Sequence, residues 1–149
     1  MAGSTSWMSN RPAVGGRPEQ RHGPDGGDHF VLIVDDDDLV RSGATRCLER
    51  LGYRTAAASD ADKALEMLRS GEVRADLLFT DIRMPGTIDG VDLAQIVRRE
   101  FPEIAILLTT GFAGNRPQPP DTRILYKPYK IADLDHAVRD SLAGHDRPA

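Results

Sequence analysis

The chain has 149 residues, a length that predicts a single domain with one hydrophobic core. Its formal net charge of -4 lacks the basic footprint of a nucleic-acid-binding protein, and its single cysteine excludes an internal disulfide or a cysteine-rich zinc site. No apolar stretch is long enough to cross a membrane and no signal segment opens the chain, so we expect a cytoplasmic protein without membrane insertion.

The composition divides the chain into a folded part and two tails. Residues 1–28 are rich in Gly, Pro, Ser and Arg and hold few large apolar residues, so we expect a disordered N-terminal tail. Residues 144–149 are expected to form a flexible C-terminal tail. The predicted folded domain therefore spans residues 29–143.

The first half of this domain alternates strand and helix signals. Residues 30–34 (FVLIV) form a continuous apolar run that is typical of a buried strand. Apolar residues then recur at helical spacing as far as Gly52, and residues 53–58 predict a weak second strand. A second helix is expected to begin at Ser59, which has capping-box spacing to Asp62.

The second half continues the alternation. Residues 76–80 (DLLFT) predict a third strand, and a loop follows in which Asp89-Gly90 indicates a turn. A helix is expected from about residue 91 to residue 101, where a proline follows. Residues 104–109 predict a fourth strand.

The last elements depart from a regular pattern. Residues 111–122 contain three prolines, which disfavour any long helix between the fourth strand and the fifth. Residues 123–126 predict the fifth strand, and an apolar stripe from Ile131 to Leu142 predicts a final helix. Strands that alternate with helices imply a parallel sheet, so the expected fold is an α/β sandwich with helices on both faces.

Four consecutive aspartates, Asp35 to Asp38, follow the first strand. The electropositive N-terminus of a helix would account for Asp37 and Asp38. Asp35 and Asp36 are better explained by a cation, and hard oxygen ligands suit Mg²⁺, Mn²⁺ or Ca²⁺ rather than zinc. Further polar residues stand where other strands end, and ligands of parallel sheets gather at that edge: Asp81, Thr109 and Lys127.

These groups together match phosphoryl transfer. Three carboxylates can bind one hard cation, and an aspartate can itself act as a nucleophile that forms an aspartyl phosphate. Positive charge from the cation and from Lys127 would stabilise the phosphoryl oxygens, and Thr109 could donate a hydrogen bond to one of them. The sequence offers no activated water or general base, so it favours a phosphate-accepting aspartate over a hydrolase.

At this point the chain resembles a receiver domain of the two-component response-regulator family. The resemblance covers residues 29–143 and rests on four segments in this order: VLIVDDDDLVR (31–41), DLLFTDIRMPGTIDG (76–90), LLTTG (107–111) and LYKPY (125–129). It implies a flavodoxin-like (βα)5 three-layer sandwich with strand order 2-1-3-4-5, in which the fourth helix is here expected to be short or irregular.

The resemblance also implies a role for each site residue. Asp35 and Asp36 match the acidic pair that holds Mg²⁺, with Mn²⁺ as an alternative, and Asp36 is the more direct ligand. Asp81 matches the phosphoacceptor and a further metal ligand, and the backbone carbonyl of Arg83 matches the remaining protein ligand.

The resemblance also implies which residues respond to phosphorylation. Thr109 matches the hydroxyl that moves toward the phosphoryl group, and Lys127 matches the lysine that pairs with it, before a Lys127–Pro128 bond that is expected to be cis. The family usually has an aromatic residue three positions before that lysine, where this chain has Ile124. The usual coupling between threonine and aromatic ring is therefore in doubt.

Three functions follow as alternatives. The first is a signalling receiver, not an enzyme, that takes phosphate from a histidine kinase or histidine phosphotransfer protein and acts on an unknown downstream protein, without an attached output domain and without nucleic acid. The second is an aspartyl-phosphate hydrolase of the haloacid-dehalogenase type, which would use Asp35 and Asp37. The third is a receiver that serves only as a binding module.

Overall fold

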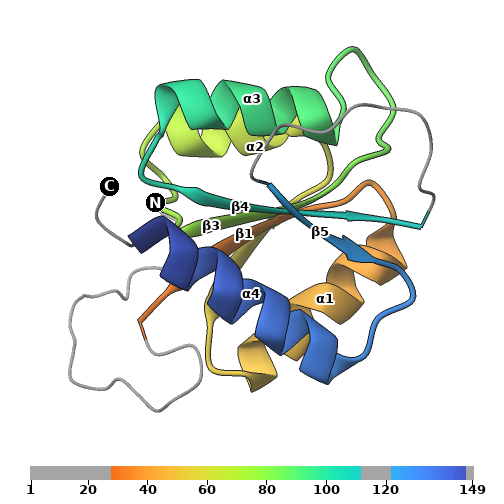
Figure 1. Cartoon of the computed structure of the whole chain (residues 1–149). Helices are drawn as coiled ribbons and strands as arrows, with labels where there is room; N and C mark the ends of the chain where they lie inside the picture. The colour runs from red at the N-terminus through yellow and green to blue at the C-terminus, as the bar shows by residue number, and fades with distance from the viewer. Residues whose placement is uncertain (1–27, 112–121, 147–149) are drawn as a thin grey trace.

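The computed structural model describes residues 28–111 and 122–146, and they form a parallel five-stranded sheet between two layers of helices (Figure 1). The sheet has the order β2-β1-β3-β4-β5 and consists of β1 Phe30–Val34, β2 Arg54–Ala58, β3 Leu77–Asp81, β4 Ala105–Thr110 and β5 Arg123–Tyr126. The helices are α1 Asp38–Arg50, α2 Ala61–Arg69, α3 Gly90–Glu100 and α4 Ile131–Asp146. The predicted strand order and layering are confirmed.

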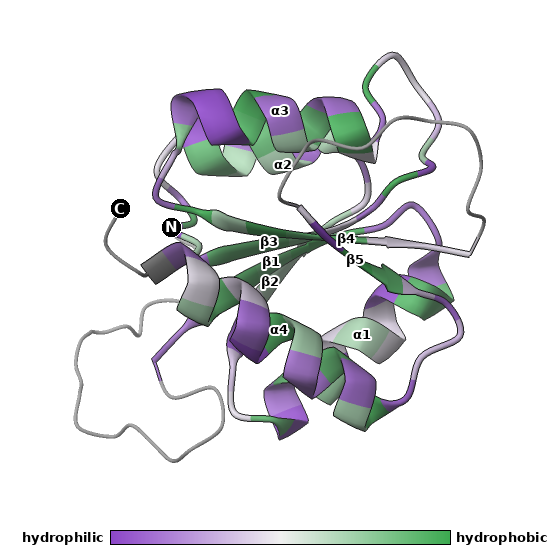
Figure 2. Cartoon of the chain, viewed as in Figure 1, coloured by the Kyte–Doolittle hydropathy of each residue, from purple (hydrophilic) through white to green (hydrophobic). Residues whose placement is uncertain are grey.

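The three central strands form the core because their side chains are apolar on both faces. Alternate residues of one strand enter different clusters: Leu32 packs on the side of α2 and α3, and Val31 on the side of α1 and α4. Figure 2 shows the same division, with apolar strands in the middle and polar residues on the outer sides of the helices. Full burial of one such side chain stabilises the fold by roughly 1.5–3 kcal/mol.

The helix starts agree with the sequence at α1 and differ from it at α2. The side chain of Asp37 caps α1 by accepting hydrogen bonds from the backbone N–H groups of Leu39 and Val40, and Asp38 is the first helical residue. The cap of α2 is Asp60 rather than Ser59, so the predicted start was wrong by one residue. Serine and aspartate are about equally good caps, and the Asp60 carboxylate also interacts favourably with the helix dipole.

The loop before α3 carries a cap as well as a turn. Asp89 accepts a hydrogen bond from the backbone N–H of Asp92, and the Asp92 side chain accepts one from the backbone N–H of Asp89. This reciprocal capping box satisfies donors at the start of the helix. The turn predicted at Asp89-Gly90 therefore also fixes the first turn of α3.

The C-terminal helix is longer than predicted. It continues to Asp146, three residues beyond the predicted domain boundary at residue 143. His145 Nε2 lies 2.8 Å from the carbonyl oxygen of Pro102, a contact that ties the last turn to the loop before β4. The Lys127–Pro128 bond is cis, as predicted.

Some predictions concern residues that the structure does not describe. The N-terminal tail falls almost wholly in residues 1–27, and the segment expected to lack a long helix falls mostly in residues 112–121. Within the described ranges, no helix has both the length and the apolar character that a membrane span requires.

Candidate functional site

Three carboxylates meet at the carboxyl edge of the sheet. β1 and β3 are neighbours with Val34 opposite Thr80, so Asp35, which follows β1, and Asp81, which ends β3, stand side by side. One carboxylate oxygen from each of Asp35, Asp36 and Asp81 lies within 4.8 Å of the others. Asp35 and Asp81 are buried, with 4% and 8% of their surface exposed, whereas Asp36 faces solvent.

Asp35 is held in place by its own loop. Its Oδ1 accepts a hydrogen bond of 2.9 Å from the backbone N–H of Asp37, and its backbone N–H donates to the carbonyl of Ala58 on β2. The guanidinium of Arg41 donates to the Asp35 carbonyl at 2.8 Å and also pairs with the carboxylate of Asp38. Arg41 is not among the site residues that the sequence predicts, and its one signal there is a basic residue one helical turn after the acidic run.

Lys127 brings a positive charge to two of these carboxylates. It follows β5, and its Nζ lies 3.5 Å from Oδ2 of Asp35 and 3.6 Å from Oδ2 of Asp81. Its backbone N–H donates to the carbonyl of Thr110 at the end of β4, which extends the pairing of these strands by one residue. Asp35, Asp81 and Lys127 thus come together from the ends of three different strands.

The electrostatic balance of the site is unfavourable to the charged form of Asp81. Burial raises the pKa of the Asp81 carboxyl, and the negative charges of Asp35 and Asp36 raise it further. Lys127 and a hydrogen bond from the backbone N–H of Arg83 lower this pKa without reversing the net increase. The net rise comes first from burial, and the site also sets one ammonium group against three carboxylates.

This charge imbalance fits a divalent cation. The oxygens of Asp35, Asp36 and Asp81 offer the hard donors that Mg²⁺ and Mn²⁺ prefer, and one of the three side chains is open to solvent. A bound ion would add the positive charge that these carboxylates lack. The donor set therefore suits the ion that the sequence predicts.

Thr109 lies beside the carboxylates with an unused hydroxyl. It is the register partner of Asp81 across β3 and β4, and its backbone carbonyl accepts a hydrogen bond from Ile82. Among the described residues, Thr109 Oγ1 is buried without a hydrogen-bond partner. A buried hydroxyl without a partner costs roughly 1–3 kcal/mol, so this group is available to a ligand that accepts a hydrogen bond at the site.

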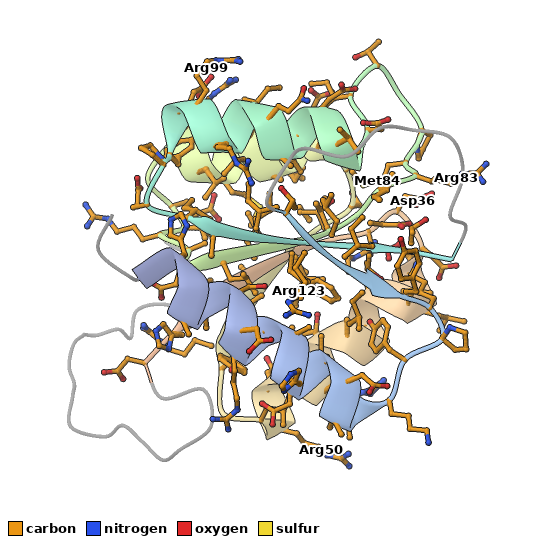
Figure 3. The ribbon with its side chains drawn as sticks, in the orientation of Figure 1. Asp36, Arg50, Arg83, Met84, Arg99 and Arg123 are labelled. Carbon is orange, nitrogen blue, oxygen red and sulfur yellow. The ribbon has the colours of Figure 1, made fainter. Side chains whose placement is uncertain are left out.

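The loop after Asp81 and the residues around Lys127 frame the site. Figure 3 shows Asp36, Arg83 and Met84 at the same edge of the molecule, with the Arg83 side chain turned outward. Ile124, at the position where the resemblance led us to expect an aromatic residue, is half-buried against the core on the side of α2 and α3. Tyr126 is exposed and lies outside that cluster.

Tyr129 is the aromatic residue packed beneath the site. Its ring meets Phe79 of β3 edge-on, with 6.3 Å between the ring centroids. Burial, with smaller contributions from Cys47 and the site carboxylates, raises the pKa of the Tyr129 phenol to about 12. The phenol is therefore neutral at physiological pH, and its ring packs against the cluster that β3 shares with α1 and α4.

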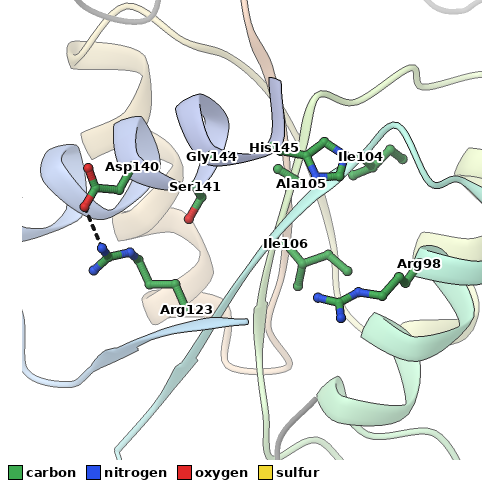
Figure 4. A pocket seen from close by; sticks show the side chains of 9 residues that line it. All are labelled: Arg98, Ile104, Ala105, Ile106, Arg123, Asp140, Ser141, Gly144 and His145. Carbon is green, nitrogen blue, oxygen red and sulfur yellow. Dashed lines mark hydrogen bonds and ion pairs between the residues drawn. The ribbon is translucent and has the colours of Figure 1, made fainter. Parts of the chain in front are cut away.

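A separate pocket opens away from the carboxylates. It lies among the end of α3, the starts of β4 and β5 and the last turns of α4, where Arg123 and Asp140 form an ion pair (Figure 4). Arg98 and His145 also line this pocket. The residues that line it include none of the predicted site residues, so we locate the candidate site at the carboxylates.

Comparison of the sequence with known proteins identifies one family and several relatives. Residues 31–139 match the family described as response regulator receiver domain. The chain is 32% identical to the response regulator receiver protein CpdR of Brucella abortus over 75% of this chain and 95% of that protein. It is 31% identical to the sensor kinase CckA of the same organism over 80% of this chain, which is 13% of the kinase.

Solved structures give the same result. A response regulator receiver protein from Sinorhizobium medicae superposes with a TM-score of 0.72 at 31% identity, over 80% of this chain and 98% of that one. The receiver domain of the hybrid histidine kinase CckA superposes with a TM-score of 0.65 at 32% identity, over 76% of this chain and 98% of that one.

Proposed function

The chain belongs to the response regulator receiver domain family, and we propose that it signals through phosphorylation of Asp81. The observation that carries this proposal is the convergence of Asp35, Asp36, Asp81 and Lys127 from three separate strand ends. A structural role does not require three carboxylates within 4.8 Å of one another, because they repel.

The proposed reaction is a phosphoryl transfer from phosphohistidine. An oxygen of the Asp81 carboxylate forms a bond to phosphorus, the P–N bond of the donor breaks, and its electron pair leaves with the imidazole nitrogen. The Nζ of Lys127, 3.6 Å from Asp81 Oδ2, is close enough to pair with the transferred group. The buried hydroxyl of Thr109 can donate to one of its oxygens.

The metal site belongs to the same proposal. Asp35, Asp36 and Asp81 would hold Mg²⁺, or Mn²⁺ in its place, together with the backbone carbonyl of Arg83. The bound ion would supply positive charge to the phosphoryl oxygens. Burial of Asp35 and Asp81 strengthens this electrostatic effect because water screens it less there.

We propose a histidine kinase or a histidine phosphotransfer protein in the cytoplasm as the donor. Receiver domains are signalling proteins, so we expect the phosphorylated form to be recognised by a downstream protein rather than to catalyse a reaction. With Ile124 half-buried in the core, we propose that the response to phosphorylation depends on Thr109 and Lys127 and not on an aromatic rotamer at position 124.

Acetyl phosphate with Mg²⁺ provides the direct test. Intact-mass measurement should show one added phosphoryl group on the wild-type chain and none on Asp81→Asn. Asp62→Asn, an equal change at an exposed position on α2, should be labelled like the wild type. An unmodified wild-type mass at saturating donor and Mg²⁺ would overturn the proposal and favour a pure binding module.

The same preparation tests the hydrolase alternative. In that alternative Asp37 would act on the substrate, but its side chain already accepts two backbone hydrogen bonds as the cap of α1. Steady turnover of a phosphomonoester that disappears in Asp35→Asn would support the hydrolase. We expect no such turnover.

A further inference from the structure

Gly90 lies directly against the backbone of the proposed phosphoacceptor. It is buried at the start of α3, and its N–H donates a 2.8 Å hydrogen bond to the carbonyl of Ile82. A Cβ atom at position 90 would stand 2.0 Å from the carbonyl oxygen of Asp81 and 2.7 Å from the Cα of Ile82. Only a residue without a side chain fits this contact.

The three nearest atoms that a Cβ at position 90 would meet are all backbone atoms, so no rotamer change can relieve the clash. The helix cannot easily retreat, because the Asp89 capping box fixes its first turn and buried side chains anchor its inner face: Val91, Leu93, Ala94 and Val97. A side chain at this position would therefore press on the end of β3.

The end of β3 is itself held at two points. The backbone N–H of Ile82 donates to the carbonyl of Thr109 at 2.9 Å, and Thr80 Oγ1 donates to the carbonyl of Asp81 at 3.0 Å. The peptide that follows the Asp81 side chain is thus fixed between β4 and the first residue of α3. Displacement of this peptide would carry the Asp81 carboxylate with it.

We propose that Gly90 is a positioning residue for phosphoryl transfer. Its lack of a side chain lets α3 seat directly on the Asp81–Ile82 peptide, which keeps the Asp81 carboxylate in reach of Lys127 and the metal-site carboxylates. This inference rests on the proposed function of Asp81. A misplacement of about 1 Å at a reacting group can reduce a rate about 100-fold, so the contact controls the rate and not only the stability.

The test is Gly90→Ala, with Gly43→Ala as its matched control. Gly43 lies within α1 and a Cβ there would meet nothing within 4 Å, so its replacement should leave phosphorylation unchanged. For Gly90→Ala we expect the maximal rate of phosphorylation by acetyl phosphate to fall at least about 10-fold per folded molecule. The donor concentration for half-maximal rate should stay within a few-fold of wild type, because the chemical step is affected.

The comparison separates positioning from stability. A merely structural role would lower the unfolding midpoint in urea while the folded fraction kept the wild-type maximal rate. If Gly90→Ala does not fold, Thr80→Val provides a second test, because it removes the hydroxyl that holds the same Asp81 carbonyl while it preserves side-chain shape. We expect a maximal rate reduced about three-fold or more, with an unchanged half-maximal donor concentration.

The outcomes are distinct. A wild-type chain that is not phosphorylated would refute the proposed function itself. A wild-type chain that is phosphorylated, together with a wild-type maximal rate in folded Gly90→Ala, would refute only the role of Gly90. Where Gly90→Ala does not fold, a wild-type maximal rate in Thr80→Val would refute the premise that the position of the Asp81–Ile82 peptide controls the rate, and with it the proposed role of Gly90.

Discussion

Replacement of Asp36 by asparagine should stabilise the metal-free protein and remove most of the stabilisation that Mg²⁺ provides. Asp36 is the exposed member of the three carboxylates, so the substitution leaves the buried core unchanged. It removes the repulsion of Asp36 against Asp35 and Asp81. It also removes one oxygen donor with a full negative charge from the proposed metal site.

The magnitude follows from the geometry. Two unit charges at 4.8 Å, the upper limit of the separations in this cluster, repel by about 0.9 kcal/mol in water and by about 3.5 kcal/mol at an effective dielectric constant of about 20. Because Asp36 faces solvent, the lower value applies, and we expect a gain of about 1 kcal/mol in the metal-free state. For a folded part of this size the melting temperature should rise by about 4 °C.

Thermal unfolding in EDTA and in Mg²⁺ provides the assay. A ligand at about 100 times its dissociation constant adds about 2.7 kcal/mol of stability, which exceeds the electrostatic gain of the variant. The order of stability should therefore reverse: Asp36→Asn melts higher in EDTA, and the wild type melts higher in saturating Mg²⁺. Asp37→Asn is the matched control, since it changes net charge equally and asparagine caps a helix as well as aspartate does.

One result would refute this reasoning. If Asp36→Asn melted no higher than wild type in EDTA and kept the full Mg²⁺ shift, the three carboxylates would neither repel measurably nor share an ion. A reversal of the same size in Asp37→Asn would show that net charge, and not the cluster, is responsible.

Three further predictions concern the groups around Asp81. Lys127→Met should slow phosphorylation by acetyl phosphate about 10- to 100-fold, as expected when a charged contact to the transferred group is lost, while Mg²⁺ affinity measured by calorimetry should not fall. In EDTA, the raised pKa of Asp81 means that the folded state binds its proton more tightly than the unfolded state. The stability that protonated Asp81 adds to the folded state is therefore fully present below about pH 4, and it is lost as pH rises through the pKa of Asp81 in the folded state. Urea unfolding across this pH range should show this loss of unfolding free energy in the wild type and not in Asp81→Asn. Arg41→Ala should lower the unfolding free energy by about 1–2 kcal/mol, because the Asp35 carbonyl loses a charged donor, and Arg41→Lys should recover part of this in the same urea assay.

Much of the fold was predictable because its signals are local. The run FVLIV at residues 30–34 coincides with β1, since a short apolar stretch that ends at a cluster of polar residues is typical of a buried strand. The start of α1 at Asp37 and Asp38 was predictable for a similar reason, because a capping residue acts on the backbone two or three positions away.

Predictions at the ends of other elements were less accurate. The prediction for the cap of α2 missed by one residue, because two neighbouring residues offered suitable oxygens and the local sequence did not decide between them. In the structure the cap is Asp60. α4 extends beyond the predicted boundary, since His145 meets Pro102, a residue 43 positions earlier in the chain. Such contacts depend on how the layers pack and leave no periodic signal in the sequence.

The sequence by itself determined that aspartates would follow buried parallel strands, because an apolar run and the residues that follow it are neighbours in the sequence. The parallel order then brings the strand ends, and with them Asp35 and Asp81, to one edge. Only the tertiary structure decided that Lys127 stands 3.5 and 3.6 Å from these two carboxylates. It alone shows that Gly90 bears on the Asp81 carbonyl, since the distance between a helix start and a strand end is set by packing in three dimensions.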